Sequence, residues 1–203
     1  YTDAQGYSNY YNQDGYSIRK SFLRTPVNFT RISSRFSLAR KHPVLNRIRA
    51  HKGVDYAAPT GTPVKATGDG TVAFAGFNGG YGRMVTLRHG EKYSTVYGHL
   101  QRFAKNISTG QRVTQGQTIG YVGMTGLATG PHLHYEFRIF GVHHNPLTVK
   151  LPAAPGIPKD ELGVFRAQTQ PLLAQLETRV ASAGESQTAV ALLKESAENT
   201  SLE

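Results

Sequence analysis

The sequence predicts a mainly β protein, with an antiparallel sheet or barrel-like domain, an extended N-terminal arm and a C-terminal helical tail. Between Arg31 and Val149, short β-type runs alternate with glycine-containing turns. No helix-length pattern separates these runs, which favours antiparallel over parallel pairing. With 203 residues, 38% of them hydrophobic, the chain can build one sizeable core. The runs are TPVKAT, GTVAFAGF, GRMVTLRH, YSTVYGHL, QTIGYVG and HLHYEFRIF.

Composition divides the chain into three regions. Residues 1–30 are rich in Tyr, Asn, Gln, Gly and Ser, and we expect an arm that partly joins the sheet near Tyr16 to Phe29. Residues 31–150 form the predicted β domain. Residues 151–203 begin with the linker LPAAPGIP and continue as a predicted helical segment.

The helical segment is predicted from apolar residues at near-helical spacing between Asp160 and Glu198. Pro171 is expected to break or kink this pattern, because proline removes a helix hydrogen bond. We therefore expect two helices, the first packing on the sheet domain away from the functional site and the second held loosely. The apolar residues are Leu162, Phe165, Leu172, Leu173 and Leu176, then Ala189, Leu192 and Leu193.

Charge is distributed unevenly along the chain. Residues 1–150 contain 19 Lys and Arg against 6 Asp and Glu, a net charge of +13, whereas residues 151–203 contain 4 against 7, a net charge of −3. Such a basic body suits an anionic partner, which could be a nucleic acid, an anionic membrane face or an acidic wall polymer. The alternative is a basic surface that serves solubility alone.

Cysteine is absent, so any transition-metal site must use His and carboxylate ligands. No apolar run approaches the roughly 18 to 20 residues that a membrane span requires. The chain begins at Tyr1 rather than Met, and we expect a mature or truncated product whose export signal or anchor has been removed.

Three short motifs hold candidate metal-binding or catalytic residues. In GPHLHYE, His132 and His134 are two apart on a predicted strand and therefore point to the same face. HKGVD places His51 and Asp55 where a turn enters a strand, and YGHL places His99 at a strand end. Taken singly, each motif has a structural alternative: two surface imidazoles, a turn capped by the carboxylate, or a polar strand tip.

Four imidazoles and one carboxylate exceed what a catalytic zinc site uses, since it takes three protein ligands and leaves one position for water. The surplus histidines could orient that water, take its proton or stabilise an oxyanion, because imidazole titrates near neutral pH. The residue types therefore indicate a metal-dependent hydrolase. The residues alone do not say which histidines are ligands.

The three motifs, in this order and with flanks such as GVDYAAPTGTPVKATGDGTV, resemble the lysostaphin- and LytM-type zinc metallopeptidases, peptidase family M23. The resemblance covers roughly residues 31–149, and the preceding FLRTPVNFTRISSRFSLARKHPV is most similar to Gram-negative murein DD-endopeptidases. It implies that His51, Asp55 and His134 bind Zn²⁺. It also implies that His99 and His132 are the catalytic pair beside the attacking water and the scissile carbonyl.

The function implied is a zinc endopeptidase that hydrolyses peptide cross-links of bacterial cell-wall peptidoglycan, with the D-alanyl-diaminopimelate bond as the expected target. Alternatives are a glycine-bridge endopeptidase of the same family and a non-enzymatic wall-binding or activator protein. A nucleic-acid-binding β-barrel would explain the charge but leave five site residues without a purpose, so no nucleic-acid partner is expected. The implied location is the periplasm or cell envelope, with a regulatory or anchoring protein as a further partner and a membrane anchor on the full-length form.

Overall fold

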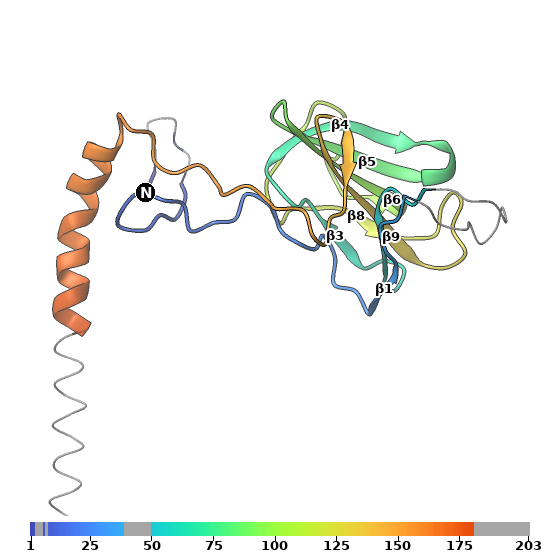
Figure 1. The fold of residues 1–203 in the computed structure, drawn as a ribbon, viewed down its shortest axis with the longest axis horizontal. Coiled ribbons are helices and arrows are strands. Elements are labelled where there is room, and N and C mark those ends of the chain that lie inside the picture. Colours follow the sequence, from blue (N-terminus) through green and yellow to red (C-terminus); the bar gives the residue numbers. More distant parts are fainter. Residues whose placement is uncertain (3–5, 7, 39–49, 181–203) are drawn as a thin grey trace, which may run out of the picture. The chain divides into compact units, whose positions relative to one another are not determined.

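A computed structural model describes residues 1–2, 6, 8–38 and 50–180 (Figure 1). The chain divides into two compact units, one formed by Lys20–Pro152 and the other by Tyr1–Arg19 together with Ala153–Glu203. The boundaries drawn from composition at residues 30 and 150 stay predictions. In the described part of the chain, no helix is both long enough and apolar enough to cross a membrane.

The larger unit is built on an antiparallel sheet, which confirms the predicted fold class. Pairing runs in the order β1-β2-β9-β6-β5-β4-β7, with β10 beside β9 and with β8 joined to both β3 and β6. The sheet does not close into a barrel. Its strands are β1 (Arg31–Ser34), β2 (Val54–Ala57), β3 (Pro63–Lys65), β4 (Gly70–Phe77), β5 (Arg83–His89), β6 (Tyr93–Phe103), β7 (Arg112–Val113), β8 (Thr118–Val122), β9 (His132–Ile139) and β10 (Val142–His144), and the short 3-10 helix η1 spans Gly79–Tyr81.

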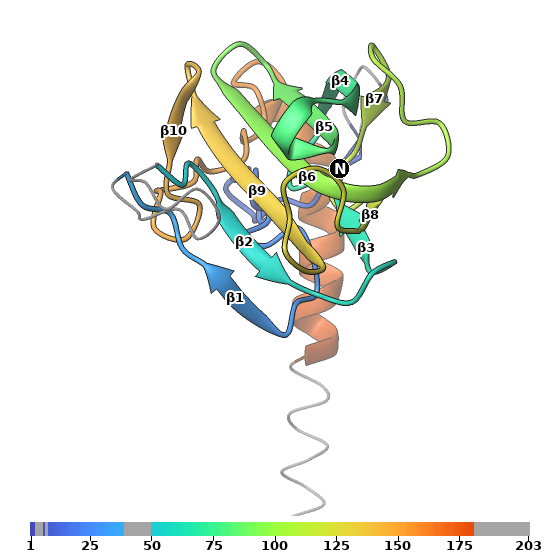
Figure 2. The same ribbon diagram turned by 90° about the vertical axis from the view of Figure 1, so that its right-hand side faces the viewer.

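Alternation along the central strands separates the core from the opposite face of the sheet. Val54 and Tyr56 of β2, and Leu133 of β9, are fully buried in the core cluster. Because successive side chains of a strand point to opposite faces, Asp55 and His134 project from the other side. Figure 2 shows β1, β2, β9 and β6 side by side, as the pairing requires. The polar face of these strands therefore carries the motifs predicted from sequence.

The segment before β1 is attached to the sheet through β3. The Leu23 amide donates to the Thr67 carbonyl at 2.7 Å, and the Lys65 amide donates to the Pro26 carbonyl at 2.7 Å. Val27 forms an isolated bridge with Val64 and is buried in the core cluster. Apolar contact and backbone bonding thus fix residues 23–27 against the β3 edge.

The smaller unit combines the tyrosine-rich arm with a helix over residues 162–180. Phe165 is buried there, with ring centroids 5.3 Å from Tyr1 and 5.9 Å from Tyr11 in edge-to-face geometry. The predicted break at Pro171 is wrong, because the helix continues through that residue. Proline removes one backbone donor, and the helical bonds on either side suffice to carry the helix past it. The second predicted helix lies outside the described residues.

Candidate metal centre and active site

Two neighbouring strands bring Asp55 and His134 together. In the antiparallel β2–β9 ladder, Asp55 pairs directly with His134 and Ala57 pairs with His132. Side chains of directly opposite residues lie on the same face and within contact distance. His51 reaches the same point from the segment before β2, where its backbone exchanges hydrogen bonds of 2.7 and 3.0 Å with Ser37.

The polar atoms of these three side chains form a triangle. His51 Nε2 lies 3.0 Å from Asp55 Oδ1, His134 Nδ1 lies 2.8 Å from the same oxygen, and the two nitrogens are 3.2 Å apart. Tetrahedral ligands at zinc bond lengths are separated by about 3.3 Å. The triangle therefore has the donor types and nearly the dimensions of a metal centre. Among the described residues, these three side chains form the group of His and carboxylate ligands close enough together to hold one metal ion.

Hydrogen bonds to the far side of each imidazole determine which nitrogen faces the triangle. His51 Nδ1 lies 2.9 Å from the Arg35 carbonyl oxygen, and His134 Nε2 lies 3.1 Å from Glu136 Oε1. Carbonyl and carboxylate oxygens accept, so these two nitrogens are placed to donate. When a metal replaces the hydrogen bonds to Asp55, His51 and His134 can each keep a proton on this far nitrogen and offer the lone pair of Nε2 or Nδ1 to the metal.

The electrostatics of the triangle favour a bound cation. Burial by itself would raise the pKa of Asp55, but hydrogen bonds and charge from His134 and His51 hold it well below its usual range. Burial would lower the pKa of His134, yet its bonds to Asp55 and Glu136 raise it to about 9. Surroundings that hold a proton so firmly also suit a divalent metal, whose binding displaces that proton.

Gly53 gives the His134 ring the space it occupies. A Cβ atom at this position would lie 2.6 Å from His134 Cε1 and 2.6 Å from the Tyr135 carbonyl oxygen. Both distances are far shorter than van der Waals contact, so any other residue would displace the ring or the β9 backbone. The glycine in HKGVD is thus a packing requirement of the site.

His99 and His132 lie beside the triangle. Their ring centroids are 4.6 Å apart, the His99 centroid is 6.0 Å from that of His134, and His132 Nε2 is 3.9 Å from Asp55 Oδ1. All five residues singled out by the motifs are therefore gathered in one place. The division into ligands and catalysts stays a proposal.

Backbone carbonyls orient both of these imidazoles. His99 Nδ1 donates to the Thr125 carbonyl and His132 Nδ1 to the Gly130 carbonyl, each at 2.8 Å. Both acceptors belong to residues 123–131, the connection between β8 and β9. Because Nδ1 carries the proton in each ring, Nε2 is left with the lone pair that acid–base chemistry uses.

His99 also has an unusual backbone and a lowered proton affinity. Its φ of 59° lies in the left-handed region, which few non-glycine residues adopt and which is enriched at functional sites. Burial lowers the pKa of His99 to about 4, against the raising effect of the Thr125 carbonyl. The ring is therefore neutral at neutral pH.

Residues not singled out from the sequence complete the site. Glu136 is fully buried behind His134, Tyr81 donates to Glu136 Oε1 at 2.7 Å, and His143 Nε2 lies 3.2 Å from Glu136 Oε2. Glu136 had a signal in the sequence, since it is two residues from His134 on one strand and must share its face. Tyr81 and His143 had none, because only tertiary structure brings them near.

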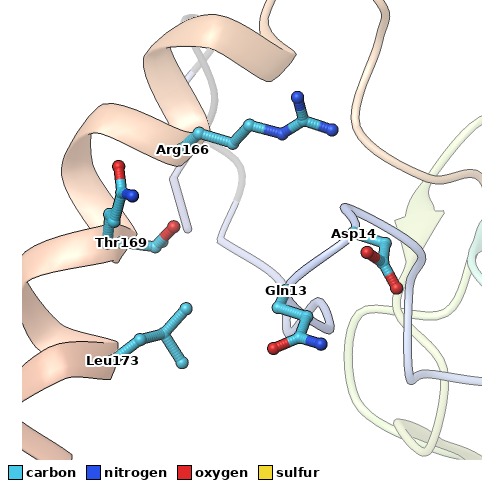
Figure 3. A pocket seen from close by; sticks show the side chains of 6 residues that line it. Gln13, Asp14, Arg166, Thr169 and Leu173 are labelled. Atoms are coloured by element: carbon cyan, nitrogen blue, oxygen red, sulfur yellow. The ribbon is translucent and has the colours of Figure 1, made fainter.

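The smaller unit has a separate cavity of about 310 Å³, lined by both the arm and the helix. Gln13 and Asp14 come from the arm, while Arg166, Thr169 and Leu173 project from the helix (Figure 3). None of its lining residues belongs to the three motifs.

Two imidazoles and one carboxylate in a triangle, with two more imidazoles beside them, are the residue types and arrangement of a metal-dependent hydrolase. Residues 49–146 match the sequence family described as Peptidase family M23. The chain belongs to peptidase family M23, which confirms the resemblance seen in its motifs.

Individual relatives agree with this membership. Over 169 residues the chain is 48% identical to peptidoglycan DD-endopeptidase ShyC of Vibrio cholerae, covering 83% of this chain and 39% of that protein. A zinc-containing peptidase from Vibrio cholerae has a TM-score of 0.62 at 36% identity, over 75% of this chain and 46% of that one. The lysostaphin catalytic domain from Staphylococcus simulans has a TM-score of 0.51 at 28% identity, over 58% of this chain and 89% of that one. The chain spans 30% to 41% of the length of curated relatives that it matches.

Proposed function

We propose that this chain is the catalytic part of a zinc endopeptidase that cleaves peptide cross-links of bacterial peptidoglycan at the D-alanyl-diaminopimelate bond. The observation that carries the proposal is the convergence of His51, Asp55 and His134 with two further histidines that backbone carbonyls orient. Relatives such as ShyC, named a peptidoglycan DD-endopeptidase, supply the substrate class.

The roles of the five residues follow from their atoms. His51 Nε2, Asp55 Oδ1 and His134 Nδ1 would hold Zn²⁺, since their separations suit tetrahedral ligands. Zinc bound there would supply a Lewis acid for the scissile carbonyl and lower the pKa of water. Of His99 and His132, one would use its Nε2 lone pair to take the proton that the attacking water loses, and would pass it to the leaving amine. The other, in its protonated form, would donate a hydrogen bond from Nε2 to the developing oxyanion.

Specificity for a diaminopimelate cross-link requires a cation for the free carboxylate of that residue. Arg35 and Arg83 are exposed, and both come from segments that contact the site. The Arg35 carbonyl accepts from His51, and the Arg83 amide donates to Thr125 Oγ1, next to the carbonyl that holds His99. A guanidinium binds a carboxylate bidentately, so these two residues are the candidates for that contact. Arg31 is exposed as well, while Arg47 and Arg49 lie outside the described residues.

The proposed substrate also implies a location and partners. A bond in the wall of a Gram-negative bacterium is reached from the periplasm, so we place the mature protein there, with a membrane anchor on its full-length form. The net charge of +13 over residues 1–150 favours attachment to the polyanionic wall. A regulatory or anchoring protein is a further proposed partner, because an unrestrained wall hydrolase would damage the cell.

Digestion of defined wall fragments tests the proposal. Zinc-loaded protein is incubated with dimeric muropeptides joined by a D-alanyl-diaminopimelate bond and, separately, with pentaglycine-bridged fragments, and products are weighed by mass spectrometry. We expect monomeric muropeptides from the first and no cleavage of the second. Cleavage of pentaglycine alone would favour the glycine-bridge alternative, and cleavage of neither would favour a wall-binding or activator role.

A further inference from the structure

Glu136 is a buried carboxylate to which the proposed reaction assigns no step. It lies on β9 two residues beyond His134 and is 0% exposed to solvent. Burying a charged carboxylate costs free energy unless partners replace the lost water. A residue so placed and so enclosed must therefore be held by specific contacts.

Those contacts fix both oxygens of Glu136. Oε1 receives the Tyr81 hydroxyl at 2.7 Å and lies 3.1 Å from His134 Nε2. Oε2 receives Arg138 Nε at 2.8 Å and lies 3.2 Å from His143 Nε2. Two partners on each oxygen prevent the carboxylate from turning about its own axis without losing several hydrogen bonds.

The fixed carboxylate matches the protonation that metal binding requires of His134. Nδ1 lies in the triangle, 2.8 Å from Asp55 Oδ1 and 3.2 Å from His51 Nε2, and a metal bound there replaces its proton. The one proton of the neutral ring then sits on Nε2, 3.1 Å from Glu136 Oε1, which accepts it. The opposite tautomer would turn a lone pair toward Glu136 and a proton into the metal triangle.

We propose that Glu136 is a positioning residue that holds His134 in the tautomer whose Nδ1 binds the metal, with Tyr81 and Arg138 clamping its two oxygens. This inference rests on the proposed function, because it assigns Glu136 a task at the same metal centre. Glu136 itself touches neither metal nor substrate. Its effect is exerted through the orientation and basicity of one ligand, as partners behind metal-bound histidines do.

Glu136→Gln is the decisive variant because it keeps the shape and removes one acceptor. The amide has a single oxygen, which the charged Arg138 takes, so the NH₂ group faces His134 Nε2 and forces the proton toward Nδ1. We expect the zinc dissociation constant, measured by chelator competition, to rise about 10- to 100-fold. The matched control is Glu91→Gln, the same chemical change at an exposed residue of the β5–β6 turn, which should leave zinc affinity unchanged.

Thermal unfolding of both variants separates positioning from general support. A merely structural Glu136 would lower the melting temperature while the folded variant kept the zinc affinity of the wild type, and that result would overturn the proposal. Histidine ¹⁵N NMR of the zinc-loaded wild type needs no variant. We expect His134 Nε2 to be protonated and Nδ1 to be bound, and the reverse assignment would also overturn it.

The outcomes distinguish this inference from the function on which it rests. Wild-type protein that binds zinc tightly, shows the expected His134 tautomer and cleaves no muropeptide would refute the proposed activity and leave the role of Glu136 standing. Unchanged zinc affinity in folded Glu136→Gln, with an active wild type, would refute the role of Glu136 alone. Wild-type protein without zinc affinity would refute both.

Discussion

Asp55 and His134 are direct partners in the β2–β9 ladder, and their Oδ1 and Nδ1 atoms are 2.8 Å apart. The register of two strands therefore sets the distance between two proposed ligands. A shift of one residue would turn one of the two side chains into the core. Sheet pairing thus sets part of the geometry of the proposed metal centre.

Variants of the proposed ligands should lose bound zinc, whereas variants of the proposed catalytic histidines should keep it. Asp55→Ala and His134→Ala each remove a corner of the triangle, so we expect loss of bound zinc and loss of activity together. His99→Ala and His132→Ala leave the triangle intact, so zinc stays stoichiometric while kcat falls by about 10²- to 10⁴-fold. Elemental analysis with muropeptide kinetics measures both. A metal-free His132→Ala beside a zinc-loaded His134→Ala would reverse the assignment.

Gly53→Ala should weaken zinc binding although it removes no polar group. The new methyl would overlap His134 Cε1 and the Tyr135 carbonyl, both 2.6 Å from its position. Overpacking of this kind costs about 1–3 kcal/mol, or about 5- to 150-fold in zinc affinity if the ring takes up the strain. Gly163→Ala is the control, since nothing lies within 4 Å of its Cβ. Equal zinc affinity for the two variants would contradict the packing role of Gly53.

Thr125→Val should slow turnover without loss of metal. The Thr125 hydroxyl accepts from the Arg83 amide at 2.9 Å and donates to the Leu100 carbonyl at 2.8 Å, which holds in place the carbonyl that orients His99. We expect kcat to fall by about tenfold, as the loss of one such anchor costs about 1–3 kcal/mol. Thr125→Ser keeps the hydroxyl and should keep most of the turnover. If steady-state kinetics give the same kcat for Thr125→Val and Thr125→Ser, the Thr125 hydroxyl does not hold the His99-orienting carbonyl in place.

His89 should make stability depend on pH independently of the metal site. Burial lowers its pKa below 6.5, although the Asp69 carbonyl, 2.7 Å from Nδ1, acts in the opposite direction. The unfolded chain then binds this proton more readily, so the free energy of unfolding decreases as pH falls below about 6.5. Melting temperatures of wild type and His89→Gln across pH 5 to 8 report the difference, because both share the metal site. If the melting temperatures of the two proteins change with pH in the same way, His89 does not contribute to the pH dependence of stability.

The strands were predictable because alternation is a local property. Val54 and Tyr56 alternate with Asp55, and Leu133 with His134, and the structure buries the apolar members as the pattern predicts. The helix was predicted correctly as an element but not in its extent, since its continuation through Pro171 depends on neighbouring hydrogen bonds rather than on proline itself.

The site was predictable only in part. Five residues could be named from three motifs, and the structure brings all five together. Strand periodicity placed His132 and His134 on one face but could not assign them different tasks, because that depends on acceptors such as Glu136 Oε1 and the Gly130 carbonyl. Tyr81 and Thr125 reach the site through tertiary contacts that leave no mark in a single sequence.

The carbonyls that orient His99 and His132 both belong to residues 123–131, and a carbonyl is common to all twenty amino acids. A scan of single substitutions would therefore not test these two carbonyls, because every replacement keeps them. Replacing the segment with that of a relative, or inserting one residue into it, would move both carbonyls. The orientation of the His99 and His132 rings would then change although neither histidine is substituted. Changes in rate or bond preference could thus arise from the backbone path of this segment rather than from the catalytic side chains.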